Sequence, residues 1–162
     1  MGLDRKKAFL ALPAVVFGAD WTLKRYIEKN METGEEKEVC GGRLIIRKHY
    51  NDGAAFGLFG AYPKAVAAVH GGLLAAAAAC YAVLLREEGK NSIKIATGLL
   101  LGGGFCNFWD RLTKQHVVDY MSFNVKCSRL RKVVFNLSDL FVFAGAVMNL
   151  FFVNLAKKRK KE

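Results

Sequence analysis

The stretch from residue 133 to residue 155 reads VVFNLSDLFVFAGAVMNLFFVNL. After a polar start it is almost continuously apolar, and its length is close to the roughly 20 residues that a helix needs to cross the hydrocarbon core of a bilayer. Asn136 and Asp139 stand three positions apart in that polar start. An ionisable residue at the edge of a membrane span is costly, so by default it marks a functional site. The stretch therefore predicts a membrane helix that begins with a functional group.

Three other runs have a similar composition and lack the polar alternation of soluble helices; they cover residues 8–23, 64–85 and 93–109. The last of them carries Gly98 and Gly102, a small-xxx-small pair that lets helices approach closely. Any single run is compatible with a soluble core helix, but four runs in 162 residues leave too little polar chain to solvate them. We therefore expect an all-α membrane protein with a small extracytoplasmic β element. Residues 1–162 would form one membrane domain, with four transmembrane helices at about 8–23, 64–85, 93–109 and 133–155 and outer loops at 24–63 and 110–132.

Lysine and arginine residues indicate the orientation of these spans. Basic residues precede the first run, follow the last one and occupy the short turn between Arg86 and Lys94. By the positive-inside rule these three regions are cytoplasmic, so both termini are expected inside. The two outer loops also contain several basic residues, which reduces the difference in lysine and arginine content between the two sides of the membrane. The net charge of +11 is then explained by topology and by the anionic headgroups of membrane lipids. No motif indicates a nucleic-acid partner.

The four cysteines do not predict a metal site. None forms a C-x-x-C pair and no histidine stands at metal-ligand spacing, so no metal and no other cofactor is expected. Cys40 and Cys127 both fall in predicted outer loops, which leaves a disulfide between them open. His70 lies inside the second run, where a hydrogen-bonded packing role is a simpler interpretation than a catalytic one.

The unusual polar residues gather at one level, the outer surface of the predicted bilayer. Residues three or four positions apart on a helix share one face, as each group within a span does here. The groups are Asp20 with Lys24, then Asn107 with Asp110 and Arg111, then Asn136 with Asp139, with Asn51 and Asp119 in the outer loops. An interfacial belt of capping and snorkelling side chains is the simpler alternative. It does not explain the preference for acids and amides over lysine. Two carboxylates in one site, Asp119 and Asp139, indicate acid–base chemistry on a water molecule.

The first outer loop predicts a small β element. Residues 43–50 (RLIIRKHY) contain a β-prone core from Leu44 to Ile46, and Asn51-Asp52-Gly53 is a turn signature. The residues that follow, up to Phe59, are small and then apolar. We expect this loop, and Phe56 in particular, to support capture of a substrate rather than its chemistry.

Five blocks of this sequence resemble, in order and spacing, the motifs of the lipoprotein signal peptidases (signal peptidase II), the integral-membrane aspartyl proteases of bacteria. The family pattern has an Asp and a Lys four apart, then N-x-G-A-A-F, G-N-x-x-D-R, V-V-D-F and F-N-x-A-D. The matching residues here are Asp20 to Lys24, Asn51 to Phe56, Cys106 to Arg111, Val117 to Tyr120 and Phe135 to Asp139. The chain departs from the pattern in several places, among them Trp21, Cys106 in place of Gly and Ser138 in place of Ala. None of the departures touches an acid.

The resemblance implies an enzyme of the bacterial cytoplasmic (inner) membrane with its active site at the extracytoplasmic face. It implies that Asp119 and Asp139 form the catalytic dyad, which removes the signal peptide from diacylglyceryl-modified prolipoproteins on the amino side of the lipidated cysteine. No metal or covalent intermediate is implied. Other residues would bind substrate or support the site: Asn107, Arg111, Asn136, Asn51, Gly53, Asp110, Asp20 and Lys24. Within this set, Asp110 would hold Arg111 or cap its helix, and Asp20 with Lys24 would brace the bundle. The protein is expected to act as a monomer.

Two other classes of function stay open at this point. A small transporter or ion-conducting protein would use acids such as Asp20, Asp119 and Asp139 as a relay, and would need polar residues through the depth of the membrane. The inner halves of the four runs are almost wholly apolar, which disfavours it. A non-catalytic membrane subunit would use the polar patch to bind a partner and would tolerate replacement of Asp119 by Asn.

Overall fold

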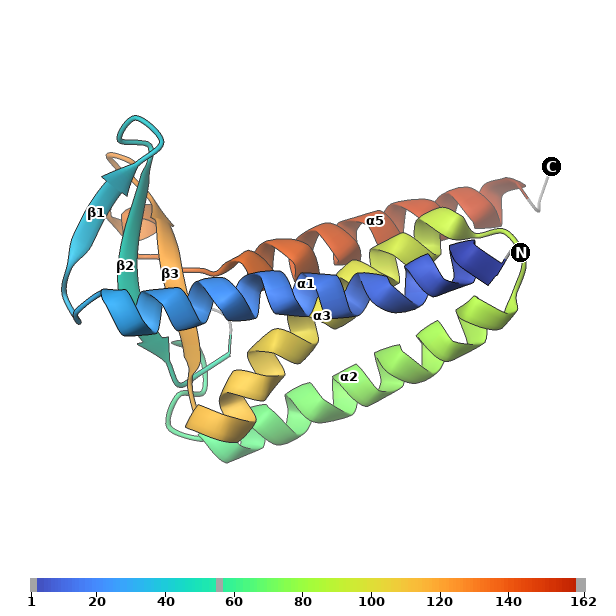
Figure 1. Ribbon diagram of the computed structural model, residues 1–162, viewed down its shortest axis with the longest axis horizontal. Helices are drawn as coiled ribbons and strands as arrows, with labels where there is room; N and C mark the ends of the chain where they lie inside the picture. The colour runs from blue at the N-terminus through green and yellow to red at the C-terminus, as the bar shows by residue number, and fades with distance from the viewer. Residues whose placement is uncertain (1–2, 55–56, 160–162) are drawn as a thin grey trace.

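The computed structural model describes residues 3–54 and 57–159, with the side chains of residues 3–5, 157 and 159 excepted. Four long helices form a bundle, and a small sheet covers one end of it (Figure 1). The elements in chain order are α1 (Leu3–Asn30), β1 (Glu36–Val39), β2 (Leu44–Asn51), α2 (Pro63–Arg86), α3 (Asn91–Lys114), β3 (Val117–Phe123), α4 (Ser128–Arg131) and α5 (Leu137–Arg159). The start of α1 and the end of α5 lie together at the end of the bundle remote from the sheet.

Three of the long helices contain an apolar run and extend beyond both of its ends, whereas α5 begins at Leu137, four residues after the start of the run predicted at 133–155. α1 continues to Asn30, and α3 continues to Lys114, so Asp110 and Arg111 lie on a helix and not in a loop. An apolar run ends where the side chains begin to contact water, whereas the backbone hydrogen bonding of the helix continues beyond that point. This difference places the polar residues of α1 and α3 on rigid helices.

Helix α3 lies at the centre of the bundle and packs against the other three long helices. Close approach depends on glycine at two of these interfaces. A Cβ atom at Gly102 would collide with the backbone oxygen of Pro13 on α1, and one at Gly145 on α5 would collide with that of Ala96 on α3. The expectation from the small-xxx-small pair is therefore confirmed at Gly102.

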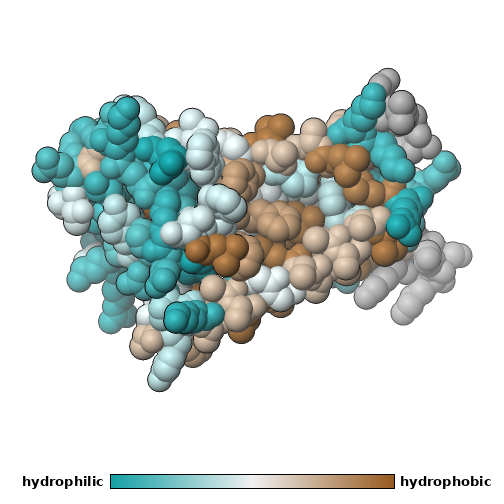
Figure 2. Space-filling model, turned by 60° about the horizontal axis from the view of Figure 1, so that its bottom comes forward, coloured by the Kyte–Doolittle hydropathy of each residue, from teal (hydrophilic) through white to brown (hydrophobic). Residues whose placement is uncertain are grey.

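Two helices, Pro63–Arg86 and Leu137–Ala156, are long and apolar enough to cross a membrane. Their apolar side chains face outward: Phe143 is 71% exposed and Val69 is 64% exposed. Figure 2 shows an apolar band across the middle of the molecule, between hydrophilic residues at its two ends. Helices α1 and α3 contain buried charged residues in addition to their apolar residues. These charged residues lower the mean hydropathy of the two helices. The surface is that of a protein whose middle lies in lipid.

The half of the bundle remote from the sheet is more polar than its sequence indicated. Lys94 is fully buried and donates to the backbone oxygen of Glu87 at 2.6 Å. Thr97 on α3 donates to the side-chain oxygen of Asn149 on α5 at 3.1 Å. These groups are hydrogen-bonded to near neighbours, as buried polar groups in native proteins are.

The three strands form an antiparallel sheet in the order β1-β2-β3. The predicted β core at residues 44–46 is confirmed as the start of β2, but the strand runs on through Asn51, the residue expected to begin a turn. β3 was expected to be loop. A left-handed residue at Gln115 (φ 66°) ends α3 and turns the chain directly into it. Cys40 and Cys127 are both free thiols.

The chain just before α5 is fixed to β3. Phe135 exchanges backbone hydrogen bonds with Met121, donating at 2.8 Å and accepting at 2.8 Å, and also accepts from the Tyr120 amide at 3.1 Å. Asp119 on β3 and Asp139 in the first turn of α5 are therefore held in one region by backbone pairing alone.

Candidate active site

Two asparagines join the two acids at the sheet end of the bundle. Asn136 donates from Nδ2 to Oδ1 of Asp119 at 2.6 Å, and Asn107 donates from Nδ2 to Oδ1 of Asp139 at 2.8 Å. The two amides are themselves linked, because Asn136 Nδ2 also donates to Asn107 Oδ1 at 3.1 Å. Asp119 and Asn136 are buried, at 2% and 0% exposure. The carboxylates thus belong to one hydrogen-bonded unit.

Asp139 is oriented by the cap of its own helix. The side chain of Asn136 accepts a hydrogen bond from the amide of Asp139 at 2.9 Å, and Oδ2 of Asp139 accepts one from the amide of Asn136 at 3.1 Å. This reciprocal pairing is a capping box, which satisfies two amide groups that the first turn of a helix leaves without partners. The spacing of Asn136 and Asp139 therefore has a local structural reason, and it fixes the rotamer of the acid.

The second oxygen of Asp119 is held from the outer loop. Asn51 Nδ2 donates to Asp119 Oδ2 at 3.1 Å, while Asn51 Oδ1 accepts from the amide of Gly53 at 3.0 Å. A Cβ atom at Gly53 would collide with the backbone of Gly57 and Leu58, so only glycine fits there. Asn51 was expected to flank the cleft, and it contacts an acid directly. Ala55 and Phe56 of the same motif lie outside the described residues.

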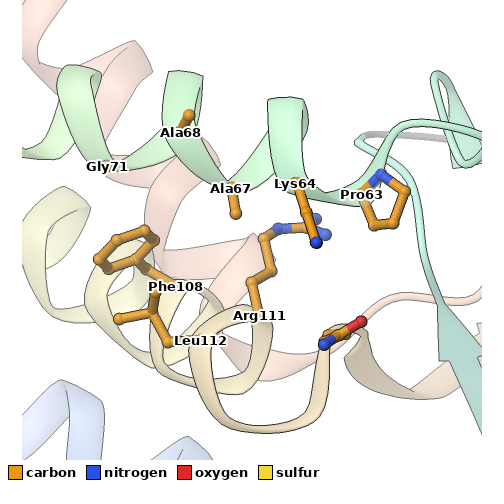
Figure 3. Close-up of a pocket in the computed structure, with 9 residues that line it drawn as sticks. Pro63, Lys64, Ala67, Ala68, Gly71, Phe108, Arg111 and Leu112 are labelled. Atoms are coloured by element: carbon orange, nitrogen blue, oxygen red, sulfur yellow. The ribbon is translucent and has the colours of Figure 1, made fainter.

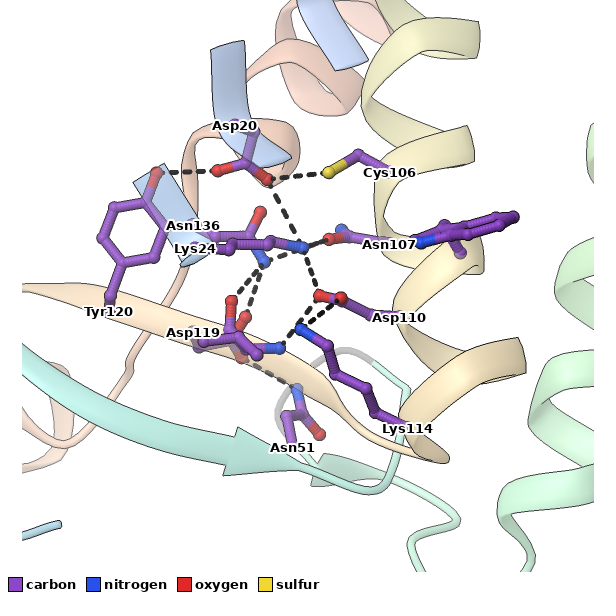
Figure 4. A network of polar contacts seen from close by, with 12 residues as sticks. Asp20, Lys24, Asn51, Cys106, Asn107, Asp110, Lys114, Asp119, Tyr120 and Asn136 are labelled. Atoms are coloured by element: carbon purple, nitrogen blue, oxygen red, sulfur yellow. Dashed lines mark hydrogen bonds and ion pairs between the residues drawn. The ribbon is translucent and has the colours of Figure 1, made fainter. Parts of the chain in front are cut away.

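A buried ion cluster supports the two asparagines from behind (Figure 4). Lys24 donates to Asn107 Oδ1 at 2.6 Å and lies 2.9 Å from Asp110 Oδ2. The expected pair of Lys24 with Asp20 is present at 3.4 Å. All three charged side chains are at most 1% exposed. The cluster reaches both acids, because Asn107 binds Asp139 directly and Asp119 through Asn136.

The expectation for Asp110 is wrong. It does not pair with Arg111; it binds Lys24 and, at 3.0 Å, Lys114, and accepts from the amide of Val118 at 3.3 Å. Adjacent residues on a helix point in different directions, whereas residues four apart share a face, which is why Lys114 and not Arg111 reaches Asp110. The sequence analysis did not single out Lys114, although its spacing from Asp110 was a usable signal.

Burial and a neighbouring charge set the protonation of Asp119. Burial, and after it the negative charge of Asp139, raise the pKa of its carboxyl to about 7, although the hydrogen bonds from Asn51 and Asn136 act in the opposite direction. A carboxyl with such a pKa holds its proton over much of the range near neutral pH. The pair therefore provides a proton donor beside a second carboxyl group.

Asp139, Asn107 and Arg111 line a cavity of about 580 Å³ with otherwise mostly apolar walls. Those walls come from one face of α2, from Val142 on α5 and from the outer loop at Ala54 and Phe59. His70 also lines this cavity and packs edge-on against Phe108, with ring centroids 5.5 Å apart. Asp139 thus borders a space suited to a largely apolar ligand.

Arg111 lies between this cavity and a second one of about 430 Å³. Another face of α2, including Lys64, Ala67 and Gly71, lines the second cavity (Figure 3). The Nε and Nη1 atoms of Arg111 are buried and have no hydrogen-bond partner among the described residues. Free donors of this kind are available to a peptide carbonyl.

The candidate residues fall into two groups. Nine of them form one connected hydrogen-bonded cluster: Asp20, Lys24, Asn51, Gly53, Asn107, Asp110, Asp119, Asn136 and Asp139. Arg111 stays outside that cluster and lines the cavity. Lys114, Tyr120 and Cys106 join the cluster without having been singled out as site residues.

Comparison with known proteins assigns the chain to a family. The profile of the signal peptidase (SPase) II family matches residues 12–155. The lipoprotein signal peptidase of Bacillus subtilis (strain 168) is 30% identical over 160 residues, which cover 95% of this chain and 98% of that protein. The lipoprotein signal peptidase of Shouchella clausii (strain KSM-K16) is 28% identical and covers 91% and 92%.

The fold also has a match among solved structures. A bacterial membrane enzyme solved by the in meso method at 2.3 Å resolution superposes with a TM-score of 0.80, at 23% identity, over 96% of this chain and 92% of that one. A second bacterial membrane enzyme, at 1.9 Å resolution, gives a TM-score of 0.76 at 23% identity over 91% and 92%. With a matching profile and near-complete coverage of its relatives, the chain belongs to the signal peptidase II family of membrane proteases, the lipoprotein signal peptidases.

Proposed function

We propose that this protein removes the signal peptide from prolipoproteins whose lipobox cysteine carries diacylglycerol, and that it cuts on the amino side of that cysteine. Asp119 and Asp139 are the catalytic acids. The observation that carries the proposal is the linkage of both carboxyl groups through Asn136 and Asn107, with Asp139 bordering a cavity at one end of an apolar bundle. A lipidated substrate keeps its acyl chains in the bilayer while its peptide bond reaches this cavity.

The two acids share one proton near neutral pH, because ionising both in a buried site is costly. We assign the proton to Asp119, whose pKa is about 7, and the role of base to Asp139. Asp139 takes a proton from a water molecule, which attacks the scissile carbonyl carbon. Asp119 donates its proton to the carbonyl oxygen as the tetrahedral intermediate forms. When the carbon–nitrogen bond breaks, the leaving amine takes up the proton that Asp139 received, and a hydroxyl group of the intermediate returns a proton to Asp119 as the new carboxyl group forms.

Arg111 and the asparagines complete this arrangement. Arg111 lines the same cavity as Asp139, and its unpartnered guanidinium donors bind carbonyl groups of the substrate backbone. Asn107 and Asn136 hold the acids in place, and Asn51 covers Asp119 from the outer side. The apolar walls of the cavity accept the hydrophobic residues that precede the cleavage position.

The proposal predicts a defined pH dependence of cleavage. Asp119 acts as an acid, so only the enzyme with a protonated Asp119 is active. This protonated form is lost as the pH rises through about 7. We expect kcat/KM for a diacylglyceryl prolipoprotein in detergent to fall about tenfold for each pH unit well above that value. The matched control is the same prolipoprotein without diacylglycerol, which should stay uncleaved. Equal cleavage of both substrates would contradict the assigned substrate class, and a flat profile up to pH 9 would contradict the role of Asp119.

We further propose that all four long helices cross the membrane, with both termini in the cytoplasm and the acids at the outer face. The basic residues at both chain ends and in the α2–α3 turn support this orientation, as does the exposed apolar surface of the bundle. The enzyme then acts as a multi-pass monomer surrounded by lipid.

Cysteine labelling in whole cells tests this topology. The exposed Cys40, Cys80 and Cys127 are replaced by serine, whereas the buried Cys106 stays as it is. In that background Asp52→Cys should react with a membrane-impermeant maleimide on intact cells. Glu88→Cys, in the α2–α3 turn, should react only after permeabilisation. The reverse pattern would overturn the orientation.

A further inference from the structure

Tyr120 follows Asp119 on β3, and its ring is buried, at 3% exposure. Its hydroxyl donates to Oδ1 of Asp20 on α1 at 2.7 Å, and Figure 4 shows the ring directed at that carboxylate. The same hydroxyl accepts a hydrogen bond from the amide of Leu137 at 3.2 Å. Leu137 is the first residue of α5, where amide groups have no acceptor within the helix. One hydroxyl therefore links three segments of the chain.

These three segments are the ones that hold the dyad. β3 carries Asp119, the first turn of α5 carries Asp139, and α1 supplies Asp20 as the fixed point. Asp20 is fully buried and is itself anchored, because its Oδ2 lies 3.4 Å from Lys24 and accepts from the Cys106 thiol at 3.5 Å. Burial and the charge of Asp20 both raise the pKa of Tyr120, so its hydroxyl stays protonated and keeps donating.

We propose that the hydroxyl of Tyr120 is a positioning group for the catalytic pair, which holds β3 against the first turn of α5 and so sets the separation of Asp119 and Asp139. The inference rests on the proposed function. It adds to the backbone pairing at Phe135, because it acts on Leu137, which is two residues closer in sequence to Asp139 than Phe135 is.

Two departures from the family motifs meet at this point. The motif has Phe where this chain has Tyr120, and Gly where it has Cys106. Each replacement adds a hydrogen-bond donor, and both donors reach Asp20, one on each carboxylate oxygen. The contacts of Asp20 with Tyr120 on β3 and Cys106 on α3 thus come from two side chains that the family motifs do not contain.

The test is Tyr120→Phe, with Tyr81→Phe as the matched control. Tyr81 is equally buried, at 6% exposure, and donates to the backbone oxygen of Phe9 at 2.6 Å, away from the acids. Both variants lose one buried hydroxyl; Tyr81→Phe loses one hydrogen bond with it, and Tyr120→Phe loses two. We expect kcat for the diacylglyceryl prolipoprotein to fall on the order of tenfold in Tyr120→Phe with little change in KM, since small misplacements of catalytic groups cost this much. Tyr81→Phe should keep the wild-type kcat.

The pH profile separates positioning from general destabilisation. If the acids move apart, the charge of Asp139 raises the pKa of Asp119 less, so the fall of kcat/KM above neutrality should begin at lower pH in Tyr120→Phe and not in Tyr81→Phe. Cys106→Ala removes the second hydrogen-bond donor to Asp20, the thiol on α3. It should also lower kcat, but by a smaller factor than Tyr120→Phe does. This variant tests the inference even if Tyr120→Phe does not fold. Wild-type kcat and pH profile in both site variants, with a lowered Tm alone, would overturn the inference. Absence of cleavage by the wild-type enzyme would instead count against the proposed function.

Discussion

Asp139→Asn is expected to abolish prolipoprotein cleavage, lowering kcat by about 10³- to 10⁴-fold, while leaving a folded protein in the membrane. The amide cannot take a proton from water, so the attacking nucleophile is not generated. The side-chain oxygen that remains can still accept the hydrogen bond from the amide of Asn136, so much of the capping box is retained. Asp119→Asn should have a loss of similar size, because the amide supplies no proton to the carbonyl oxygen.

The measurement is single-turnover cleavage of a diacylglyceryl prolipoprotein in detergent, with the Tm of each variant recorded alongside. Asp52→Asn is the matched control, since Asp52 is an exposed acid on the outer loop next to Asn51. It should cleave at the wild-type rate. Activity near wild type in either dyad variant would contradict the assignment of that acid.

The double variant gives a further test of the pair as a unit. Groups that act in one step are strongly non-additive, so Asp119→Asn with Asp139→Asn together should be hardly slower than either single variant. If the two losses multiplied, the acids would act in separate steps, and the shared-proton mechanism would be wrong.

The sequence predicted those parts of the site that are encoded locally. Asn136 and Asp139 form a capping box, which needs only a three-residue spacing and the start of a helix. Asp20 and Lys24 pair because residues four apart share a helix face. Four apolar runs indicated four long helices, and the structure has a long helix at each.

Other features depend on contacts between distant segments and had no local signal. The hydroxyl of Tyr120 binds Asp20, one hundred positions away, and the Cys106 thiol reaches the same residue across the α1–α3 interface. β3 was missed because it is buried on both sides over most of its length, so the alternation typical of a half-buried strand is absent. Lys94 was interpreted only as a basic residue of the turn that orients the spans, and its burial against the backbone oxygen of Glu87 was not predicted.

The second large effect concerns stability. Lys24→Met is expected to destabilise the folded protein by about 3–5 kcal/mol, because it leaves Asp20 and Asp110 buried without their shared cation. Methionine fills a similar volume, so the loss reflects charge and hydrogen bonding more than a cavity. A loss of this size should lower the Tm in detergent by on the order of 10 °C for a chain of this length. Asn107 also loses its donor at 2.6 Å, so kcat should fall as well.

An exposed ion pair provides the control for this prediction. Lys37 lies 2.8 Å from Glu35, but its side chain is 57% exposed, and exposed ion pairs contribute little to stability. Lys37→Met should therefore leave the Tm close to that of the wild-type protein. Adding Asp110→Asn to Lys24→Met removes one of the two buried carboxylates that have lost Lys24 and should recover part of the loss, whereas Asp110→Asn alone should destabilise. If Lys24→Met shifted the Tm no more than Lys37→Met does, the buried cluster would contribute nothing to stability, and the support that it gives the two asparagines would have to come from helix packing.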